Sequence, residues 1–269
     1  MKKDHNKVVV ITGASSGIGL ATAEYLNERG YVVYGFSRRK AANDKFTLLQ
    51  ADVCNHLDVV NAFEYVYERE KRIDVVINNA GMGISGPIEN TDKADVEKIF
   101  NTNVVGLIDV CSVAIKYLKQ TRGRIVNIGS VGGPAPLPFQ ACYSACKSAV
   151  ETFSYALNGE VSDFGIRVIC VRPGDTKTGF TSARIKTLEN DKDYGNRVQR
   201  SVEKMEKDEQ GGKSPVSVSK VIYGCLKRKN PPPVVTVGYT YKLICSLLKI
   251  LPQRFVNRAI KKIYGGNAS

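Results

Sequence analysis

The sequence lacks a long hydrophobic run. Its N-terminus, MKKDHNKVVVITGASSG, is basic, but the apolar run VVVI leads at once into a glycine-rich turn, whereas a signal peptide needs a longer apolar centre. Crossing a bilayer takes roughly 20 apolar residues, and no stretch of the chain approaches that length. We therefore expect a cytoplasmic protein without a membrane-spanning helix.

Paired cysteines are missing as well. The seven cysteines are odd in number and include no CxxC pair, so neither a disulfide framework nor a zinc site is indicated, and we expect no bound metal. We interpret Cys142 and Cys146 as small packing residues of a helix.

Acidic residues are absent from the last part of the chain. After Glu209 the sequence holds eleven Lys or Arg residues and no Asp or Glu, within a net charge of +13. Such a surface suits an anionic partner, which could be a phosphorylated cofactor, an acidic protein, membrane headgroups or nucleic acid. No nucleic-acid-binding motif is present, so we predict no nucleic-acid partner. A merely soluble basic face is the alternative.

Short apolar runs rich in β-branched residues recur along the chain, at residues 8–11, 31–36, 74–77, 124–128 and 167–171. Segments of helical length and period lie between them, which predicts parallel strands buried on both faces. We predict a single domain over residues 1–269, of α/β class, with a Rossmann-type doubly wound parallel sheet. In such sheets ligands bind beyond the carboxyl ends of the strands.

The first candidate site is TGASSGIG, directly after the first predicted strand. Gly13, Gly17 and Gly19 open a helix that we expect to begin near Leu20. Glycines there permit a tight turn and let backbone amides approach a pyrophosphate, which the helix N-terminus stabilises. The turn predicts a dinucleotide site.

The turn after the second strand reads GFSRRK, where an NAD-binding protein would present an acidic residue to the ribose. Ser37, Arg38 and Arg39 can instead donate hydrogen bonds to a 2′-phosphate. This pattern favours NADP(H) over NAD(H). After the third strand, Asp52 and Val53 are expected at the edge of the adenine.

Further motifs follow the later strands: NNAG at residues 78–81, IGSVGG with Ser130, YSACK at residues 143–147, and RPGDTKTGF at residues 172–180. On a helix, Tyr143 and Lys147 would project side by side from one face. Together with TGASSGIG and NTNVVG, these motifs resemble the short-chain dehydrogenase/reductase family in order and spacing over roughly residues 7 to 180.

The resemblance implies catalytic roles for four residues. Tyr143 would be the acid/base, Ser130 would donate to the substrate oxygen, Lys147 would bind the nicotinamide ribose, and Asn103 would hold a water linked to Lys147. We expect the ammonium and the cationic nicotinamide to lower the pKa of Tyr143. The cofactor-binding residues carried over are Gly13, Ser15, Ser16, Gly17, Ile18, Gly19, Ser37, Arg38, Arg39, Asp52, Val53, Asn79, Ala80, Gly81, Tyr143, Lys147, Pro173, Gly174, Thr176 and Thr178.

Two features depart from the common family pattern. About ten residues separate strands two and three, too few for a full helix, and a C-terminal helical tail, residues 239–269, follows the last predicted strand PVVTVG. The tail predicts two amphipathic helices joined at Pro252, with apolar stripes through Leu243, Ile244, Leu247, Leu248 and Leu251, then Phe255, Val256, Ala259, Ile260 and Ile263. Packing over the substrate cleft and lying on an anionic membrane surface both stay open.

We therefore predict an NADP(H)-dependent oxidoreductase that interconverts a carbonyl and an alcohol on an apolar, steroid- or lipid-like substrate. The charged stretch at residues 180–215 is expected to be its mobile substrate-binding segment. The resemblance also implies a homodimer or homotetramer, and the basic tail indicates peripheral membrane contact. The alternatives are reduction of a 3-oxoacyl chain on an acidic carrier protein and a non-catalytic NADP-sensing protein.

Overall fold

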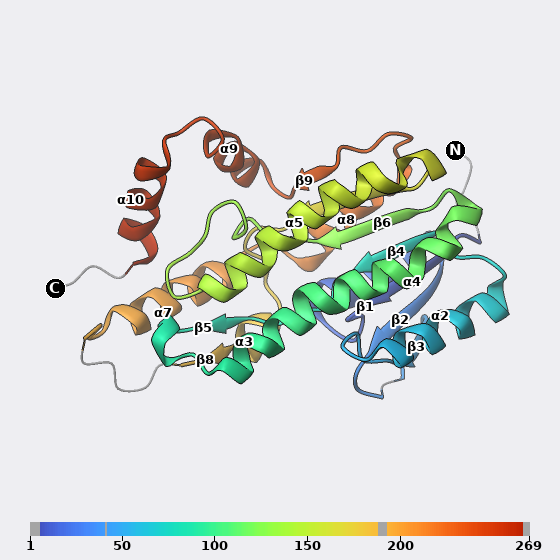
Figure 1. Ribbon diagram of the computed structural model, residues 1–269, viewed down its shortest axis with the longest axis horizontal. Coiled ribbons are helices and arrows are strands. Elements are labelled where there is room, and N and C mark those ends of the chain that lie inside the picture. Colours follow the sequence, from blue (N-terminus) through green and yellow to red (C-terminus); the bar gives the residue numbers. More distant parts are fainter. Residues whose placement is uncertain (1–5, 41, 188–192, 266–269) are drawn as a thin grey trace.

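The central feature of the chain is a sheet of seven parallel strands in the order β3-β2-β1-β4-β6-β7-β9 (Figure 1). The structure is a computed structural model that describes residues 6–40, 42–187 and 193–265. Parts of the predicted substrate segment and tail, at 188–192 and 266–269, therefore lie outside the described residues. The strands are β1 Val8–Thr12, β2 Val32–Ser37, β3 Thr47–Gln50, β4 Val75–Asn78, β6 Arg124–Ile128, β7 Arg167–Arg172 and β9 Val234–Thr236.

The inner strands are buried on both faces, as their continuous apolar runs predicted. All five residues of β1 are buried, and their side chains alternate between two cores because successive residues of a strand point to opposite faces. Val8 and Val10 belong to one core, Val9 and Ile11 to the other. The sheet therefore separates two hydrophobic layers, which confirms the doubly wound arrangement.

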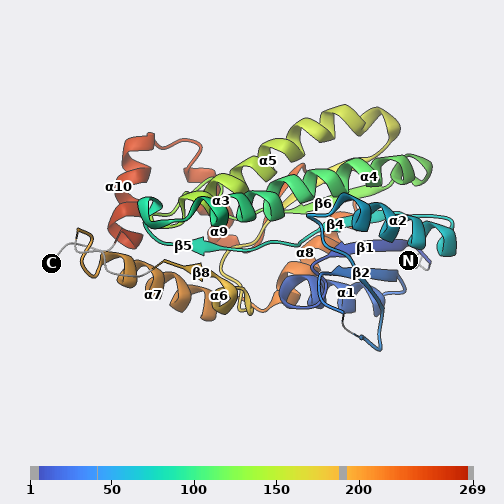
Figure 2. The ribbon, with the colours of Figure 1, turned by 60° about the horizontal axis from the view of Figure 1, so that its bottom comes forward.

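Helices cover both faces of the sheet (Figure 2). Phe63, Val110 and Val150 enter the first core, while Leu26 and Ile222 enter the second. The first face is covered by α2 His56–Glu70, α4 Gly106–Thr121 and α5 Ala141–Val161, and the second by α1 Gly17–Asn27 and α8 Pro215–Lys227.

A π-helical turn, η2 Asn101–Val105, joins α3 Lys93–Phe100 to α4. The resulting helical run, Lys93–Thr121, has 29 residues. It is the one helix in the described part of the chain whose length and composition would allow it to cross a membrane, although we expected no membrane-spanning helix from the sequence. About 44% of its apolar window is buried inside the protein, and Val110 and Leu118 lie in the first core. A core helix passes the same test of length and composition.

The connection between β2 and β3 contains no helix among its described residues, as its length predicted. Phe46 from this loop is 7% exposed and packs against the second core. A Cβ on Gly35 of β2 would lie 3.0 Å from the Phe46 ring. The loop thus covers the sheet directly, where other connections provide a helix.

The segment before the tail holds a structure that the sequence did not predict. β5 Ile84–Ser85 and β8 Ile185–Lys186 form a separate two-stranded parallel sheet. The remaining elements are η1 Ile88–Asn90, η3 Ser162–Phe164, α6 Phe180–Ala183, α7 Arg197–Gln210, α9 Tyr239–Leu247 and α10 Gln253–Tyr264. Pro252 caps α10, so the predicted pair of tail helices is confirmed. The strands point toward the end of the molecule where α7, α9 and α10 lie (Figure 1).

Candidate active site

The glycine-rich turn after β1 adopts a backbone that other residues could not. Gly13 and Gly17 have φ of 66° and 56°, in the left-handed region. A Cβ on Gly19 would collide with the carbonyl oxygen of Gly13, and one on Gly17 would lie 3.5 Å from Thr178. Ser16 makes no capping hydrogen bond with its side chain, so the first backbone amides of α1 are available to an anion.

Asn79 fastens the end of β4 to this turn. Its Nδ2 donates to the carbonyl oxygens of Thr12 and Gly13, each at 3.1 Å. The Thr12 hydroxyl accepts from the backbone amides of Asn79 and Ala80, each at 3.0 Å. The predicted residues Asn79 and Ala80 therefore brace the glycine turn, and Gly81 follows directly.

Two cations stand at the carboxyl end of β2. Ser37 is buried, whereas Arg38 and Arg39 are exposed, and neither arginine forms an ion pair within the described part of the chain. Gln50 donates to the Arg38 carbonyl at 3.3 Å, which fixes the backbone there. Two free guanidiniums beside the glycine turn could hold a phosphate group.

Asp52 and Val53 lie in the turn that follows β3. The Asp52 carboxylate accepts from the backbone amide of Cys54 at 3.0 Å, and its own amide donates to Asp58 at 3.0 Å. Val53 is 7% exposed and packs in the first core. The side chains of this turn are therefore largely engaged within the protein.

The proton-transfer candidates lie together on α5 and the loop after β6. Tyr143 and Lys147 are one turn apart, and the Lys147 ammonium is 5.7 Å from the centre of the Tyr143 ring. Lys147 is 8% exposed and donates to the carbonyl oxygen of Ile128 at 2.8 Å. The Ser130 hydroxyl accepts from the amide of Gly132 at 3.0 Å.

Burial shifts the pKa of both groups toward their neutral forms. The pKa of Tyr143 is raised to about 12 by burial, against the opposing effect of a hydrogen bond with Ser130. The pKa of Lys147 is lowered to about 8 by burial. The expected lowering of the Tyr143 pKa is therefore not produced by these protein groups, because burial outweighs them and the ammonium is directed at Ile128. At neutral pH Tyr143 is a protonated phenol and Lys147 a cation.

Asn103 lies within the π-helical turn and is 1% exposed. Its side-chain amide donates to the Met82 carbonyl at 2.9 Å and accepts from the Met82 amide at 2.8 Å. Both ends of the side chain thus hold the chain that follows Gly81. A water held by Asn103, as the resemblance implied, would have to bind its main chain or the remaining hydrogen-bonding positions of this side chain.

The turn after β7 closes the site from the other side. The Pro173 carbonyl accepts from the amide of Val131 at 3.0 Å, which ties this turn to the Ser130 loop. The Thr176 hydroxyl donates to the Gly174 carbonyl at 2.9 Å. Thr178 faces the glycine-rich turn, so the predicted motifs converge on one edge of the sheet.

A charged pair near Tyr143, made of a buried arginine and a half-buried glutamate, was not predicted. Arg184 forms an ion pair with Glu209, which also accepts from the Thr181 hydroxyl at 2.6 Å. The Phe180 ring lies 5.7 Å from the Tyr143 ring, and Glu209 raises the Tyr143 pKa while Arg184 lowers it. Nε and Nη1 of Arg184 are buried without a hydrogen-bond partner in the described part of the protein. No local pattern marks a buried arginine inside a charged stretch, so this ion pair could not be predicted from the sequence.

The remaining surroundings of Tyr143 are apolar. A third, smaller cluster contains the buried residues Ile84, Ile99 and Cys146, with Met82, Phe100, Val104, Cys142, Tyr143 and Ile185 packed against them. Within the described residues, no group of three or more His, Cys, Asp or Glu side chains could hold a metal ion. The site combines a phenol, a hydroxyl and an ammonium with an apolar wall, which suits proton transfer to an oxygen on an apolar molecule.

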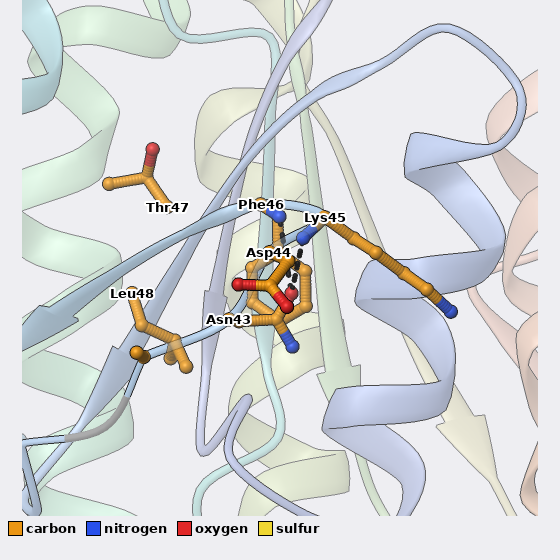
Figure 3. A pocket seen from close by; sticks show the side chains of 7 residues that line it. Asn43, Asp44, Lys45, Phe46, Thr47 and Leu48 are labelled. Carbon is orange, nitrogen blue, oxygen red and sulfur yellow. Dashed lines mark hydrogen bonds between the residues drawn. The ribbon is translucent and has the colours of Figure 1, made fainter.

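A hollow of about 460 Å³ lies away from these groups, along residues 42–48 of the loop between β2 and β3 (Figure 3). Asn43 accepts there from the amides of Lys45 at 2.8 Å and Phe46 at 3.2 Å. The Lys45 ammonium donates to Glu24 of α1 at 3.0 Å. The hollow contains none of the predicted site residues, and we interpret it as a consequence of the short connection.

Comparison with known proteins supports the same chemistry. The sequence model of the short chain dehydrogenase family matches residues 7–189. A 3-ketodihydrosphingosine reductase from Bacteroides thetaiotaomicron is 40% identical over 96% of this chain and 98% of its own. An NADPH-dependent 1-acyldihydroxyacetone phosphate reductase from Saccharomyces cerevisiae is 30% identical over 68% of this chain and 66% of its own. A short-chain dehydrogenase from Streptomyces avermitilis superposes with a TM-score of 0.82 at 27% identity, covering 97% of this chain and 96% of its own.

Proposed function

We propose that this chain, which belongs to the short-chain dehydrogenase family of oxidoreductases, reduces a keto group on a lipid-like substrate with NADPH. Such enzymes act on CH–OH groups and on the corresponding carbonyls. The first candidate is the 3-keto group of a long-chain sphingoid base. The main support is the relative named for that reaction, because its similarity spans 96% of this chain. That span includes the segments around the site that would contact a substrate.

The residues present fit a dinucleotide. A Cβ on Gly13 would lie 2.9 Å from Ala80, so glycine is needed there for the turn to pack against the end of β4. The packed turn leaves the first backbone amides of α1 available to a pyrophosphate. The pyrophosphate would bind at the N-terminus of α1 and the nicotinamide ribose at Lys147. Arg38 and Arg39 would hold the 2′-phosphate, which favours NADPH over NADH. The yeast relative is named as NADPH-dependent.

When bound, NADPH supplies the hydride that reduces the carbonyl carbon. Tyr143 gives its phenolic proton to the carbonyl oxygen, and its pKa of about 12 keeps that proton in place at neutral pH. Ser130 donates a hydrogen bond to the same oxygen as negative charge develops on it. Lys147 stabilises the phenolate that Tyr143 leaves behind, because its pKa of about 8 keeps it cationic at pH 7.

The polar end of the substrate has a candidate partner in Arg184. Its Nε and Nη1 are donors without a hydrogen-bond partner in the described part of the protein, and a hydroxyl oxygen beside the keto group would satisfy them. Glu209 holds Arg184 in position through the ion pair. An apolar chain with a small polar head therefore matches the site better than a wholly apolar steroid.

The direct test is NADPH oxidation by the purified protein with a panel of ketones: 3-ketodihydrosphingosine, a ketosteroid and an acetoacetyl thioester. We expect turnover with the sphingoid ketone to exceed the others. Tyr143→Phe should abolish turnover and leave NADPH affinity nearly unchanged, because the ring still packs against Phe180. Strong residual turnover in that variant would refute the role of Tyr143.

The second candidate is reduction of a 3-oxoacyl chain on an acidic carrier protein. The net charge of +13 favours an acidic partner. Faster turnover of the acetoacetyl thioester than of the other ketones would favour this second function. NADPH binding without turnover of any compound would instead favour a sensing protein.

A further inference from the structure

The tail helices expose an unusual concentration of apolar side chains. Of the sixteen large hydrophobic residues exposed in the described chain, eight lie between residues 239 and 263. Tyr239 and Ile250 are each 82% exposed, and Phe255 is 63% exposed. We call these eight the tail patch: Tyr239, Leu243, Ile244, Leu247, Ile250, Leu251, Phe255 and Ile263.

The patch is distinct from the face with which the tail packs on the protein. On α10, Val256 is 4% exposed, whereas Phe255 and Ile263 face outward with Ala259 between them, at helical spacing. On α9, Cys245 is buried, whereas Leu247 on the opposite side is exposed. The predicted single apolar stripe of each helix thus divides into an inward part and an outward part.

Positive charge borders the patch. All six lysines and arginines of the tail are exposed, and none forms an ion pair within the described residues. They are Lys242, Lys249, Arg254, Arg258, Lys261 and Lys262. On α10 the cations stand one position before the outward apolar residues, Arg254 before Phe255 and Lys262 before Ile263. A basic stripe therefore runs beside the apolar stripe along the same helix.

We propose that the tail patch docks on an anionic phospholipid surface. Apolar side chains would enter the boundary between headgroups and acyl chains while the neighbouring cations meet the anionic headgroups. A second copy of the chain fits this face poorly, because pairing would bring two sets of six cations together without an acidic residue after Glu209 to balance them.

The inward face places the patch beside the catalytic site. From α9, Tyr241 donates to Asp175, which lies in the turn after β7. From α10, Tyr264 donates at 3.0 Å to Asp208 of α7, the helix that also carries Glu209. Figures 1 and 2 both show α10 next to α7, at the end toward which the strands point. Docking would bring the site close to the lipid, which, on the function proposed above, is where a long-chain ketone resides.

The test is sedimentation of the full-length protein with phosphatidylcholine vesicles that contain or lack phosphatidylserine. We expect binding to the anionic vesicles and weakening by salt. Arg254→Gln with Arg258→Gln should lower affinity roughly 25-fold, at about fivefold for each charge. Ile250→Ser with Phe255→Ser should lower it at least about tenfold, because two apolar side chains no longer insert.

Matched control variants replace two apolar residues by serine, or two cations by glutamine, outside the tail. Leu57→Ser with Ile88→Ser alters residues that are 67% and 59% exposed outside the tail, and Lys220→Gln with Lys229→Gln removes two exposed charges of α8 and the loop after it. Both controls should bind vesicles as the unaltered protein does.

Three results would overturn the proposal: no binding to anionic vesicles, equal losses in controls and patch variants, or patch variants that change the oligomeric state while vesicle binding persists. The last result would assign the patch to a second copy. NADPH binding should be the same in every variant, so docking is judged separately from the substrate assignment. Failure of the sphingoid ketone as substrate would leave the vesicle result standing.

Discussion

Replacing Lys147 by methionine should abolish activity without weakening the fold at neutral pH. Lys147 is 8% exposed, and burial lowers its pKa from 10.5 to about 8. Since one pKa unit is worth about 1.4 kcal/mol, the buried charge opposes folding by roughly 3 kcal/mol at pH 7. Methionine has a similar length and no charge, so it removes this term and still fills the space.

The substitution also removes a hydrogen bond. The ammonium donates to the Ile128 carbonyl at 2.8 Å, and leaving a buried carbonyl unpaired costs about 1–3 kcal/mol. The two effects together give a net gain of about 0–2 kcal/mol at pH 7. For a chain of this size the midpoint of thermal unfolding should rise by at most about 8 °C, at about 2–4 °C for each kcal/mol.

The pH dependence of the stability difference shows whether the buried charge of Lys147 causes it. The pKa of Lys147 is lower in the folded state than in the unfolded state, so its cost is complete below about pH 8 and fades as pH rises toward 10.5. Near pH 10 the methionine variant should therefore no longer be more stable than the unaltered protein. Its free energy of unfolding should instead be lower, because the hydrogen bond to Ile128 is lost. Urea unfolding at both pH values measures this, with Lys98→Met as the exposed control. A stability difference that does not change with pH would refute the reasoning.

Three further substitutions test other parts of the site. Arg38→Asp should raise the Kd for NADPH about 10- to 100-fold and leave NADH binding unharmed, because a charge-assisted hydrogen bond to the 2′-phosphate is lost; unchanged selectivity in titrations would contradict the 2′-phosphate assignment. Gly19→Ala should impair dinucleotide binding through a collision of its Cβ, whereas Gly224→Ala, with nothing within 4 Å, should be tolerated, as calorimetric titration and thermal unfolding would show. Arg184→Met should destabilise the protein by about 1–3 kcal/mol because it leaves the half-buried Glu209 carboxylate without its ion-pair partner, and adding Glu209→Met should restore most of the loss in urea unfolding.

Local signals predicted most of the fold. Strands buried on both faces show as continuous apolar runs, so β1, β4 and β7 could be located from composition alone. The glycine turn was predictable because the backbone there needs φ values that Gly13 and Gly17 supply. The lack of a helix among the described residues between β2 and β3 followed from the length of that connection.

Other features depend on contacts between distant residues. β5 and β8 are two residues each and pair across about a hundred positions, so neither carries a recognisable period. The ion pair of Arg184 with Glu209 has the same origin. The direction of the Tyr143 pKa was wrong for the protein's own groups because spacing reveals a neighbouring charge but not the depth of burial. NADP(H) preference, oligomeric state and cellular location stay predictions.

The contact between α9 and the turn after β7 limits how the chain can be divided. Gly174 has no side chain, and the Tyr241 ring occupies the space where a Cβ would stand. A chain cut after residue 238 would therefore lose part of the scaffold of the turn after β7 along with its terminal helices. The tail is not an interchangeable appendage, and grafting it onto another dehydrogenase would require a glycine at the matching position of the recipient.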